Sequence, residues 1–249
     1  MVADGEWKTG SVQGRTARVK SGRYYVCKRA IDIVVSATLL VLLAPILLLI
    51  AVLIRLDTPG PILFAQERCG ARLRLFSGEQ RPPEICTFTF YKFRTMYANA
   101  SPDRHREFVQ AYIRNDEAAM AVLQNGDTAG RNKYKMVGDP RITPVGRVLR
   151  KLSLDELPQL WNVLRGDMSL VGPRPAIPYE VEEYQPWHRQ RLEAKPGVTG
   201  LWQVTGRSAT TFDEMVRLDL EYIDKQSLWL DLVIMVKTPL AVLSGRGAA

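Results

Sequence analysis

The chain has 249 residues, enough for one large domain or two small ones, and 46% are hydrophobic while 24% are charged. Its 34 lysines and arginines against 26 acidic residues give a net charge of +8. An anionic partner is therefore expected: nucleic acid, a lipid surface or a phosphorylated substrate. Three widely spaced cysteines and only two histidines argue against a disulfide framework, a zinc site or Ser-His-Asp chemistry.

Residues 1–23 are polar and basic and lack the apolar core of a signal peptide, so they are predicted to form a flexible basic tail. The run from Ile33 to Ile54 then carries no charge over 22 residues. A helix of this length, at about 1.5 Å per residue, could just cross a hydrocarbon core of about 30 Å. Membrane insertion of residues 24–56 is therefore favoured over a buried core helix.

Basic residues flank both ends of this apolar run, and the positive-inside rule draws both ends toward the cytoplasm. A straight span cannot satisfy both ends, whereas a helix that enters, bends and returns can. Pro45 favours a bend, because its missing N–H leaves the Val41 carbonyl unpaired. We expect a re-entrant helix-break-helix with its break at Ala44 and Pro45, and keep a full span as the alternative.

Residues 57–249 are predicted to be a cytoplasmic domain of the α+β class, mostly helical with a small β element. Ile62–Gln66 and Cys86–Phe93 indicate strands, and Ser77–Glu84 indicates a polar loop. Residues 99–137 are interpreted as an insertion, helical in part and with the character of a lid.

Turn signals and apolar spacing define the remaining elements. They are a short basic helix or turn at Arg147–Lys151, a helix over Leu154–Leu164 ended by Gly166, strand and turn at Lys195–Arg207, and helices at Phe212–Lys225 and Ser227–Leu243. The last helix carries Trp229 and few charges, which suits an interfacial or a core position equally.

Adjacent carboxylates, Asp155 and Glu156, lie at the expected start of the helix that Gly166 ends. Ser153 and Glu156 have the spacing of a capping box. Pro158 would then delete a helical hydrogen bond, whereas Asp155 as the cap would leave Pro158 in the first turn. Either version gives the carboxylates a structural role, opposing the helix dipole.

The same location also suits phosphate chemistry. Free N–H groups at a helix start favour phosphate oxygens, and a carboxylate there can bind Mg²⁺. Arg174, held extended by Pro175, could supply a bidentate phosphate contact, or could instead lie over a helix C-terminus. A carboxylate can also attack a phosphoryl group while its neighbour assists with the proton.

The chain resembles the bacterial monotopic phosphoglycosyl transferases over about residues 24–243. The resemblance rests on these stretches, taken in order: Lys28-Arg29-x-x-Asp32, Pro59–Pro61, Tyr91–Met96, Asp139–Gly146, Ser153–Leu160, Gly166–Pro175, Lys195–Gly200 and Ser227–Asp231.

The resemblance implies transfer of a sugar-1-phosphate from a UDP-sugar to polyprenyl (undecaprenyl) phosphate, with release of UMP, as a first membrane step of exopolysaccharide or other glycoconjugate assembly. It also implies a ping-pong scheme with a covalent aspartyl-phosphosugar intermediate. The membrane element would be re-entrant in the bacterial inner membrane, with the catalytic domain and interfacial amphipathic helices on its cytoplasmic face. Anionic lipid would be a further partner and nucleic acid would not; a homodimer is left open.

Residue roles follow from the matched positions. The resemblance implies Asp155 as nucleophile and Mg²⁺ ligand, and Glu156 as its assistant. Phosphate or nucleotide-sugar contacts are implied for Arg150 and Arg174, and less directly for Lys92, Arg94 and Arg207. Recurring acidic positions of unassigned role are Asp167, Asp219 and Asp231.

The chain departs from the family pattern at two points. The helix break is Ala44-Pro45 rather than the frequent Ser-Pro, so no hydroxyl can satisfy the freed carbonyl. Residues 99–137 exceed what a minimal catalytic core needs. Apart from these two points, and unlike the larger relatives, the chain is expected to have no transmembrane bundle ahead of residue 28.

Two rival functions stay open. A membrane-anchored scaffold with a basic face would turn over no nucleotide sugar. A metal-dependent glycosyl transferase would release UDP instead of UMP, although the chain has no Asp-x-Asp. The sequence does not identify the sugar, and glucose or galactose is preferred only by family analogy.

Overall fold

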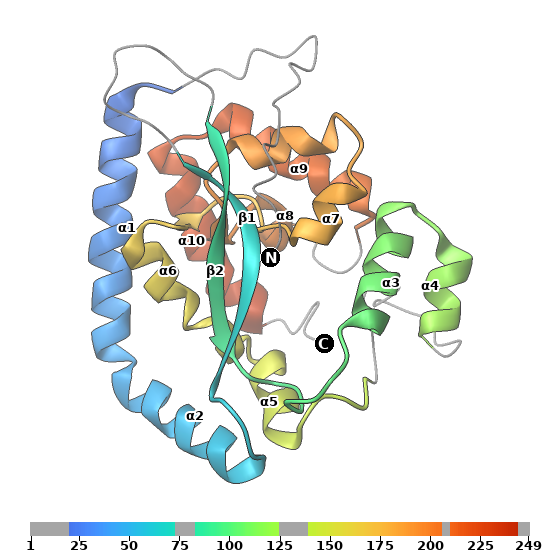
Figure 1. Ribbon diagram of the computed structural model, residues 1–249. Helices are drawn as coiled ribbons and strands as arrows, with labels where there is room; N and C mark the ends of the chain where they lie inside the picture. Colours follow the sequence, from blue (N-terminus) through green and yellow to red (C-terminus); the bar gives the residue numbers. More distant parts are fainter. Residues whose placement is uncertain (1–19, 73–82, 125–138, 206–209, 244–249) are drawn as a thin grey trace.

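The protein is described by a computed structural model over residues 20–72, 83–124, 139–205 and 210–243 (Figure 1). Helices and two small sheets are mixed along the chain, as the α+β prediction requires. Residues 1–19 of the predicted tail, most of the loop expected at Ser77–Glu84, and Arg207 lie outside the described residues.

The chain begins with two helices that meet at a sharp bend. Helix α1 spans Gly22–Leu42 and α2 spans Ala44–Asp57, with an angle of 61° between them. Pro45 lies in the first turn of α2, where its missing N–H costs no hydrogen bond. The predicted break at Ala44 and Pro45 is therefore confirmed. Figure 1 shows α1 along one side of the molecule and α2 turning beneath it.

Among the described helices, none alone is long and apolar enough to cross a bilayer. Only the bent pair α1–α2 meets that criterion by length and composition, as a broken span or as a re-entrant loop. Many of its apolar side chains point outward, with exposed fractions of 74% at Val41, 68% at Leu48 and 78% at Leu56. A core helix would bury these side chains, so the core-helix interpretation is wrong.

A long antiparallel hairpin follows the helix pair. Strand β1 spans Leu63–Arg72 and β2 spans Glu84–Phe93, in a register that pairs Leu63 with Phe93 and Arg72 with Glu84. Both predicted strands are confirmed, but β1 runs further than expected and Glu84 is part of β2 rather than of a loop. Pairing with the partner strand satisfies the backbone there, which overrides the weak strand propensity of the charged residues.

The expected insertion contains two short helices, α3 at Asp103–Ile113 and α4 at Glu117–Leu123, which project from the domain in Figure 1. The rest of its loop lies outside the described residues. Helix α5 then spans Pro144–Lys151, longer than the predicted basic turn, and the Thr143 hydroxyl caps it by accepting from the Gly146 N–H.

The remaining elements alternate short helices with two very short strands. They are η1 (Leu154–Glu156), α6 (Gln159–Arg165), β3 (Ser169–Val171), α7 (Pro178–Glu182), η2 (His188–Glu193), β4 (Gly197–Thr199), α8 (Leu201–Thr205), α9 (Phe212–Lys225) and α10 (Leu228–Leu243). Strands β3 and β4 pair in parallel. The predicted helix over Phe212–Lys225 has the same bounds as α9. The prediction of strand and turn after Gly200 is wrong, because α8 packs there against α9 and α10.

Polar residues near the start of α1 attach it to the domain. Arg29 donates from Nη1 and Nη2 to the carbonyls of Val163 and Leu164 at 2.5 and 2.7 Å, and so caps the C-terminus of α6. The buried Asp32 accepts from the Ser169 hydroxyl at 3.1 Å and from the Leu170 N–H at 2.9 Å, which holds α1 on β3.

A second attachment joins α1 to the C-terminal helices through Asp231. Its carboxylate accepts from Tyr24 Oη at 3.0 Å, Lys28 Nζ at 2.9 Å and Tyr222 Oη at 2.6 Å. Below these contacts, apolar residues of α1 join a core cluster with β2, α6 and α10. One face of α10 is buried there at Ile234, whereas Trp229 is 73% exposed, so α10 is neither a fully buried helix nor a free one.

Asp32→Ala is expected to lower the free energy of unfolding by about 1–3 kcal/mol, because two buried donors lose their acceptor. Chemical denaturation of the protein in detergent micelles, followed by circular dichroism, measures this. Arg23→Ala, at an exposed position of the same helix, is the control and should stay within about 0.5 kcal/mol of wild type. Equal midpoints for the two variants would contradict the anchoring role of Asp32.

Candidate active site

Asp155 and Glu156 belong to the single 3₁₀ turn η1, between α5 and α6. Both predicted capping arrangements are wrong. Ser153 adopts the left-handed conformation, at φ 54°, and its side chain makes no capping hydrogen bond. Pro158 is itself the N-cap of α6, because proline fits a helix start but cannot donate within the helix. A left-handed serine is uncommon, and such backbone is often found at functional sites.

Asp155 is a buried carboxylate that faces a buried amine. Its side chain is 7% exposed, and Oδ2 lies 3.6 Å from Nζ of Lys92, which is itself 20% exposed. Burial raises the pKa of Asp155; Lys92 and Arg150 act in the opposite direction, and Glu156 adds to the rise. Burial likewise lowers the pKa of Lys92, against the pull of Asp155. The two groups share a site that is poor in water.

Arg150, on α5, is held beside this pair by Thr95, which follows the end of β2 by two residues. Its Nε donates to Thr95 Oγ1 at 2.9 Å, and Asp155 is the carboxylate with the largest influence on its pKa. Helix α5 approaches the chain at Thr95 very closely, because a Cβ on Gly146 would lie 2.2 Å from the Thr95 carbonyl oxygen. Glycine at this position therefore lets α5 carry Arg150 into contact with Thr95.

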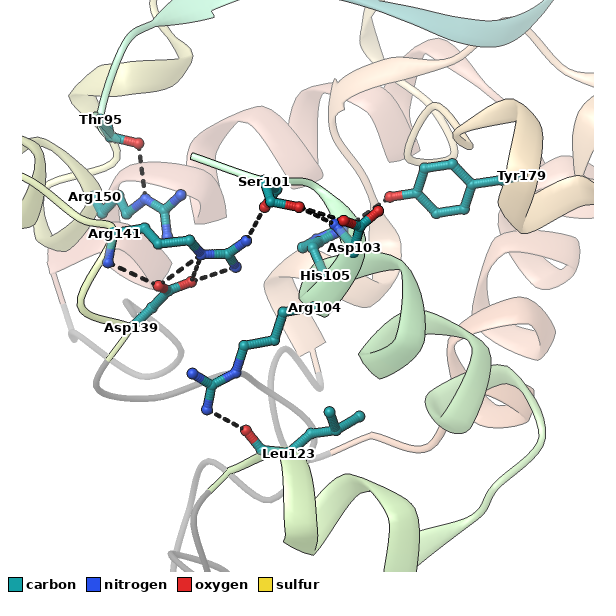
Figure 2. A network of polar contacts seen from close by, with 10 residues as sticks. All are labelled: Thr95, Ser101, Asp103, Arg104, His105, Leu123, Asp139, Arg141, Arg150 and Tyr179. Carbon is teal, nitrogen blue, oxygen red and sulfur yellow. Dashed lines mark hydrogen bonds and ion pairs between the residues drawn. The ribbon is translucent and has the colours of Figure 1, made fainter. Parts of the chain in front are cut away.

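A second arginine extends the network away from Asp155 (Figure 2). The Asp139 carboxylate accepts from Arg141 Nε and Nη2 at 2.9 and 2.7 Å, and Arg141 Nη1 donates to the Ser101 carbonyl. Arg141 thereby ties the turn before α5 to the segment that leads into α3. Asp139 also acts electrostatically on Arg150, so it balances both cations.

Arg174 lies on the loop after β3 and is exposed, while the prolines on either side of it are buried. Strand β1 fixes this loop: Arg68 Nη1 donates to the Pro175 carbonyl at 3.0 Å, and the Cys69 N–H donates to the Ala176 carbonyl at 2.8 Å. Arg174 is thus presented outward by a stiff loop, as the sequence predicted.

Arg94, predicted as a phosphate contact, is placed elsewhere. It is buried, and its guanidinium donates to the carbonyls of Pro59 at 2.5 Å and Thr58 at 2.7 Å, at the C-terminal end of α2. These carbonyls occupy the guanidinium, so Arg94 is better explained as the attachment of α2 to the domain. Arg207 lies outside the described residues.

The three acidic positions of unassigned role also have partners that are part of the fold. Asp219 forms a buried ion pair with Arg191 at 2.6 Å, and Asp231 holds α1 as described above. Asp167 accepts from Asn162 Nδ2 at 3.2 Å and lies 3.4 Å from Arg165 Nε. In the described part of the chain, these partners lie in other elements than the turn that contains Asp155, so the three acidic residues are explained by the fold.

Sequence reasoning gave no role to four residues that the structure brings to this region. Thr95 lies in the matched stretch Tyr91–Met96, and Arg68 is one of the basic residues after the apolar run, but neither was assigned a role at the site. His105 and Tyr179 come from α3 and α7, and their ring nitrogen Nδ1 and hydroxyl oxygen lie 2.9 Å apart (Figure 2). Only the fold reveals this pair, because 74 residues separate its members.

The site can attract a polyanion and expose a carboxylate to it. No cluster of three or more His, Cys, Asp or Glu side chains suited to a metal is present in the described part of the chain. Magnesium, however, commonly takes one or two carboxylates and completes its shell with water and substrate phosphates. Asp155, with Glu156 adjacent, fits that donor set; the described chain offers no self-contained metal cage.

Comparison with known proteins gives a consistent result. The family model described as bacterial sugar transferase matches residues 23–245. The exopolysaccharide production protein ExoY of Sinorhizobium fredii is 39% identical over 90% of this chain and 88% of its own length. The undecaprenyl-phosphate galactose phosphotransferase of Salmonella typhimurium is 39% identical over 95% of this chain and 44% of its own.

A third relative, the undecaprenyl-phosphate glucose phosphotransferase of Komagataeibacter xylinus, is 39% identical over 89% of this chain and 36% of its own length. The chain thus spans less than half of several curated relatives that it matches. ExoY of Sinorhizobium fredii, by contrast, is covered almost completely.

Proposed function

The chain belongs to the bacterial sugar transferase family, and on that premise we propose that it transfers a sugar-1-phosphate from a UDP-sugar to polyprenyl phosphate, releasing UMP. The observation that carries the proposal is a buried Asp155 at 3.6 Å from Lys92, with Arg150 held beside it. A carboxylate in that position is both approachable by a phosphate and kept from free solvent.

In the first half-reaction, an Asp155 carboxylate oxygen attacks the β-phosphorus of the donor. A bond forms between that oxygen and phosphorus, and the bond from phosphorus to the bridging oxygen breaks. UMP leaves with the electron pair and needs no proton, because its phosphate is a stable anion. Lys92 and Arg150 oppose the negative charge that builds on the phosphoryl oxygens.

In the second half-reaction, an oxygen of polyprenyl phosphate attacks the same phosphorus. The bond to Asp155 breaks, which regenerates the carboxylate and gives a lipid diphosphate sugar. Glu156, half-buried and next to Asp155 in the same turn, accepts the proton of the acceptor phosphate when that group arrives protonated.

We further propose that Asp155 holds Mg²⁺ together with oxygens of the donor diphosphate. When bound, the ion would neutralise charge on those oxygens. Lys92 and Arg150 provide fixed positive charge from the protein at the same place.

The membrane element is proposed to be re-entrant, with both its ends and the catalytic domain on the cytoplasmic face of the bacterial inner membrane. The 61° bend and the outward apolar side chains of α1 and α2 support this. Exposed apolar residues of α10, among them Trp229, Val236 and Leu240, suit contact with the same lipid surface. A soluble donor and a lipid acceptor can then meet at one site.

The sugar is proposed to be glucose or galactose phosphate, for assembly of an exopolysaccharide or another glycoconjugate. Relatives named for galactose and for glucose transfer support the preference. A relative named for N-acetylgalactosamine, 36% identical, shows that the family also includes other sugars.

Asp155→Asn is expected to abolish the covalent intermediate and lower UMP release by at least about 1,000-fold, because an amide is a poor nucleophile. Purified protein is incubated with UDP-galactose or UDP-glucose and Mg²⁺ without acceptor, and its intact mass is recorded. Wild type and the control Asp167→Asn should both gain one hexose phosphate. Release of UDP, or unchanged labelling of Asp155→Asn, would refute the mechanism.

The pH profile offers a separate test of the charge balance at Asp155. Activity should fall as the pH drops through the raised pKa of Asp155, above the value of about 3.9 for an ordinary aspartate. Lys92→Met removes the cation that lowers this pKa, so the acid limb should move to higher pH. Lys92→Arg keeps the charge and should shift the limb less. A limb at the same pH in all three proteins would contradict the pairing.

Topology is tested by labelling with a membrane-impermeant maleimide. Cys27 is exposed before the apolar run, and Glu67 is exposed after it. The single variant Cys86→Ser leaves Cys27 as the probe before the apolar run. The triple variant Cys27→Ser, Cys86→Ser, Glu67→Cys places the probe at position 67, after the run. Cys69 is buried in both variants. Both positions should react only after the cells are lysed. Reaction of one position in intact spheroplasts and of the other only after lysis would exclude re-entry.

A further inference from the structure

A line of cations leads from Asp155 across the face of the hairpin. The Phe90 ring carries Lys92 Nζ 5.9 Å from its centroid and Arg68 Cζ 5.1 Å from it. Lys92 faces Asp155, whereas Arg68 reaches the Pro175 carbonyl on the loop that presents Arg174. The positive charge at Asp155 therefore continues toward this loop and does not end at Lys92.

Only some of these cations are open to a ligand. Arg68 is 4% exposed, and its Nη1 and Nη2 donate to the Pro175 carbonyl and to Gln66 Oε1, so it acts as a fixed charge beneath the surface. Arg174 is exposed, and its guanidinium has no ion-pair partner among the described residues. An incoming anion would meet Arg174 directly and Arg68 through its field.

Helices α3 and α7 complete the far side of this charged surface. His105 Nδ1 lies 2.9 Å from Tyr179 Oη, and Arg106 lies over the Tyr179 ring, 5.5 Å from its centroid. His105 and Tyr179 are half-buried, and their imidazole and hydroxyl groups are uncharged polar groups among the surrounding arginines and Lys92.

The charges around His105 come from every packed element. Burial and then Arg68, Arg174, Lys92 and Arg141 lower the pKa of His105 to about 4. Asp103 and Arg106 neighbour it on α3, Glu180 lies on α7 beside Tyr179, and Glu182 of α7 pairs with Arg106 at 3.5 Å. The imidazole is therefore neutral at neutral pH. An anion bound among these cations would offset their field and allow His105 to take up a proton.

Resting on the proposed function, we propose that His105, Tyr179 and Arg174 form the subsite for the phosphate of the leaving nucleotide. The sugar is uncharged, so a field of cations does little for it. The nucleotide phosphate, by contrast, gains negative charge as the bridging bond breaks, and stabilising that charge favours the transition state. The cations extending away from Asp155 thus mark the direction in which UMP leaves.

The phosphate of the polyprenyl acceptor has the same chemistry, so binding of the two must be measured separately. Calorimetry of the protein in detergent gives the affinity for UMP, and steady-state kinetics give kcat/KM for polyprenyl phosphate. Arg174→Gln should weaken UMP binding about 10-fold or more, and His105→Gln and Tyr179→Phe about 3- to 10-fold. The kcat/KM for polyprenyl phosphate should change less than 2-fold, because in a ping-pong scheme it depends only on the second half-reaction.

Arg104→Gln is the matched control, because Arg104 also lies on α3 but donates to the Leu123 carbonyl (Figure 2). It should bind UMP as wild type does. The affinity of wild type for UMP, divided by that of His105→Gln, should also rise as the pH falls from 8 to 6. The pKa of His105 is expected to be higher with UMP bound than without it, so protonation of His105 strengthens binding. The comparison cancels the titration of UMP itself, and a purely structural role for His105 would leave the ratio constant.

Unchanged UMP affinity in all three variants, or a lowered kcat/KM for polyprenyl phosphate alone, would overturn the proposal. Failure of the proposed function looks different: wild type would release no UMP from a UDP-sugar, yet UMP would still bind and respond to the variants. Arg174 is exposed, so Arg174→Gln is expected to fold and keeps the test decisive if another variant does not.

Discussion

The grip of α1 on α6 is the constraint on which the rest of the structure depends. Arg29 bonds the last carbonyls of α6, and Asp32 bonds the start of β3, so the same turn of α1 holds two neighbouring elements. The opposite end of α6 begins just after the turn that contains Asp155. A seven-residue helix is a rigid rod of about 10 Å, so in the proposed membrane arrangement the depth of α1 would set the height of Asp155 above the lipid surface.

Around Asp155, two cations oppose the effect of burial on the carboxyl group, as its proposed role as nucleophile requires. Burial alone would favour protonation of Asp155, and Lys92 and Arg150 work against it without a close, fully bonded ion pair. The 3.6 Å separation between Lys92 Nζ and Asp155 Oδ2 matters. In a closer ion pair, a substrate phosphate would have to compete with Asp155 for Lys92. Arg150 is held through its Nε by the Thr95 hydroxyl rather than by a carboxylate. The two terminal nitrogens of Arg150 are therefore left for a ligand.

Local patterns in the sequence predicted local structure well. The charge-free run, the hairpin and α9 follow from composition and periodicity within a short window, and the bend follows from Pro45. The capping prediction failed because the left-handed backbone at Ser153 depends on tertiary packing. The charged residues show the same limit: Arg94 looks like a ligand contact until its carbonyl partners, 35 to 40 positions away, are seen. Sequence reveals a charge but not its partner.

The insertion between β2 and α5 gains a physical purpose from the same reasoning. As sequence it is only a polar segment longer than the reaction requires. In the fold, α3 places His105 against Tyr179 and leaves the histidine within the field of Arg68, Arg174 and Lys92. The Arg141 bridge to the Ser101 carbonyl ties the start of this segment to the turn that carries Asp139. Helix α3 is thus part of the wall of this charged surface, and under the proposed subsite a change in α3 would alter phosphate binding before it altered the core.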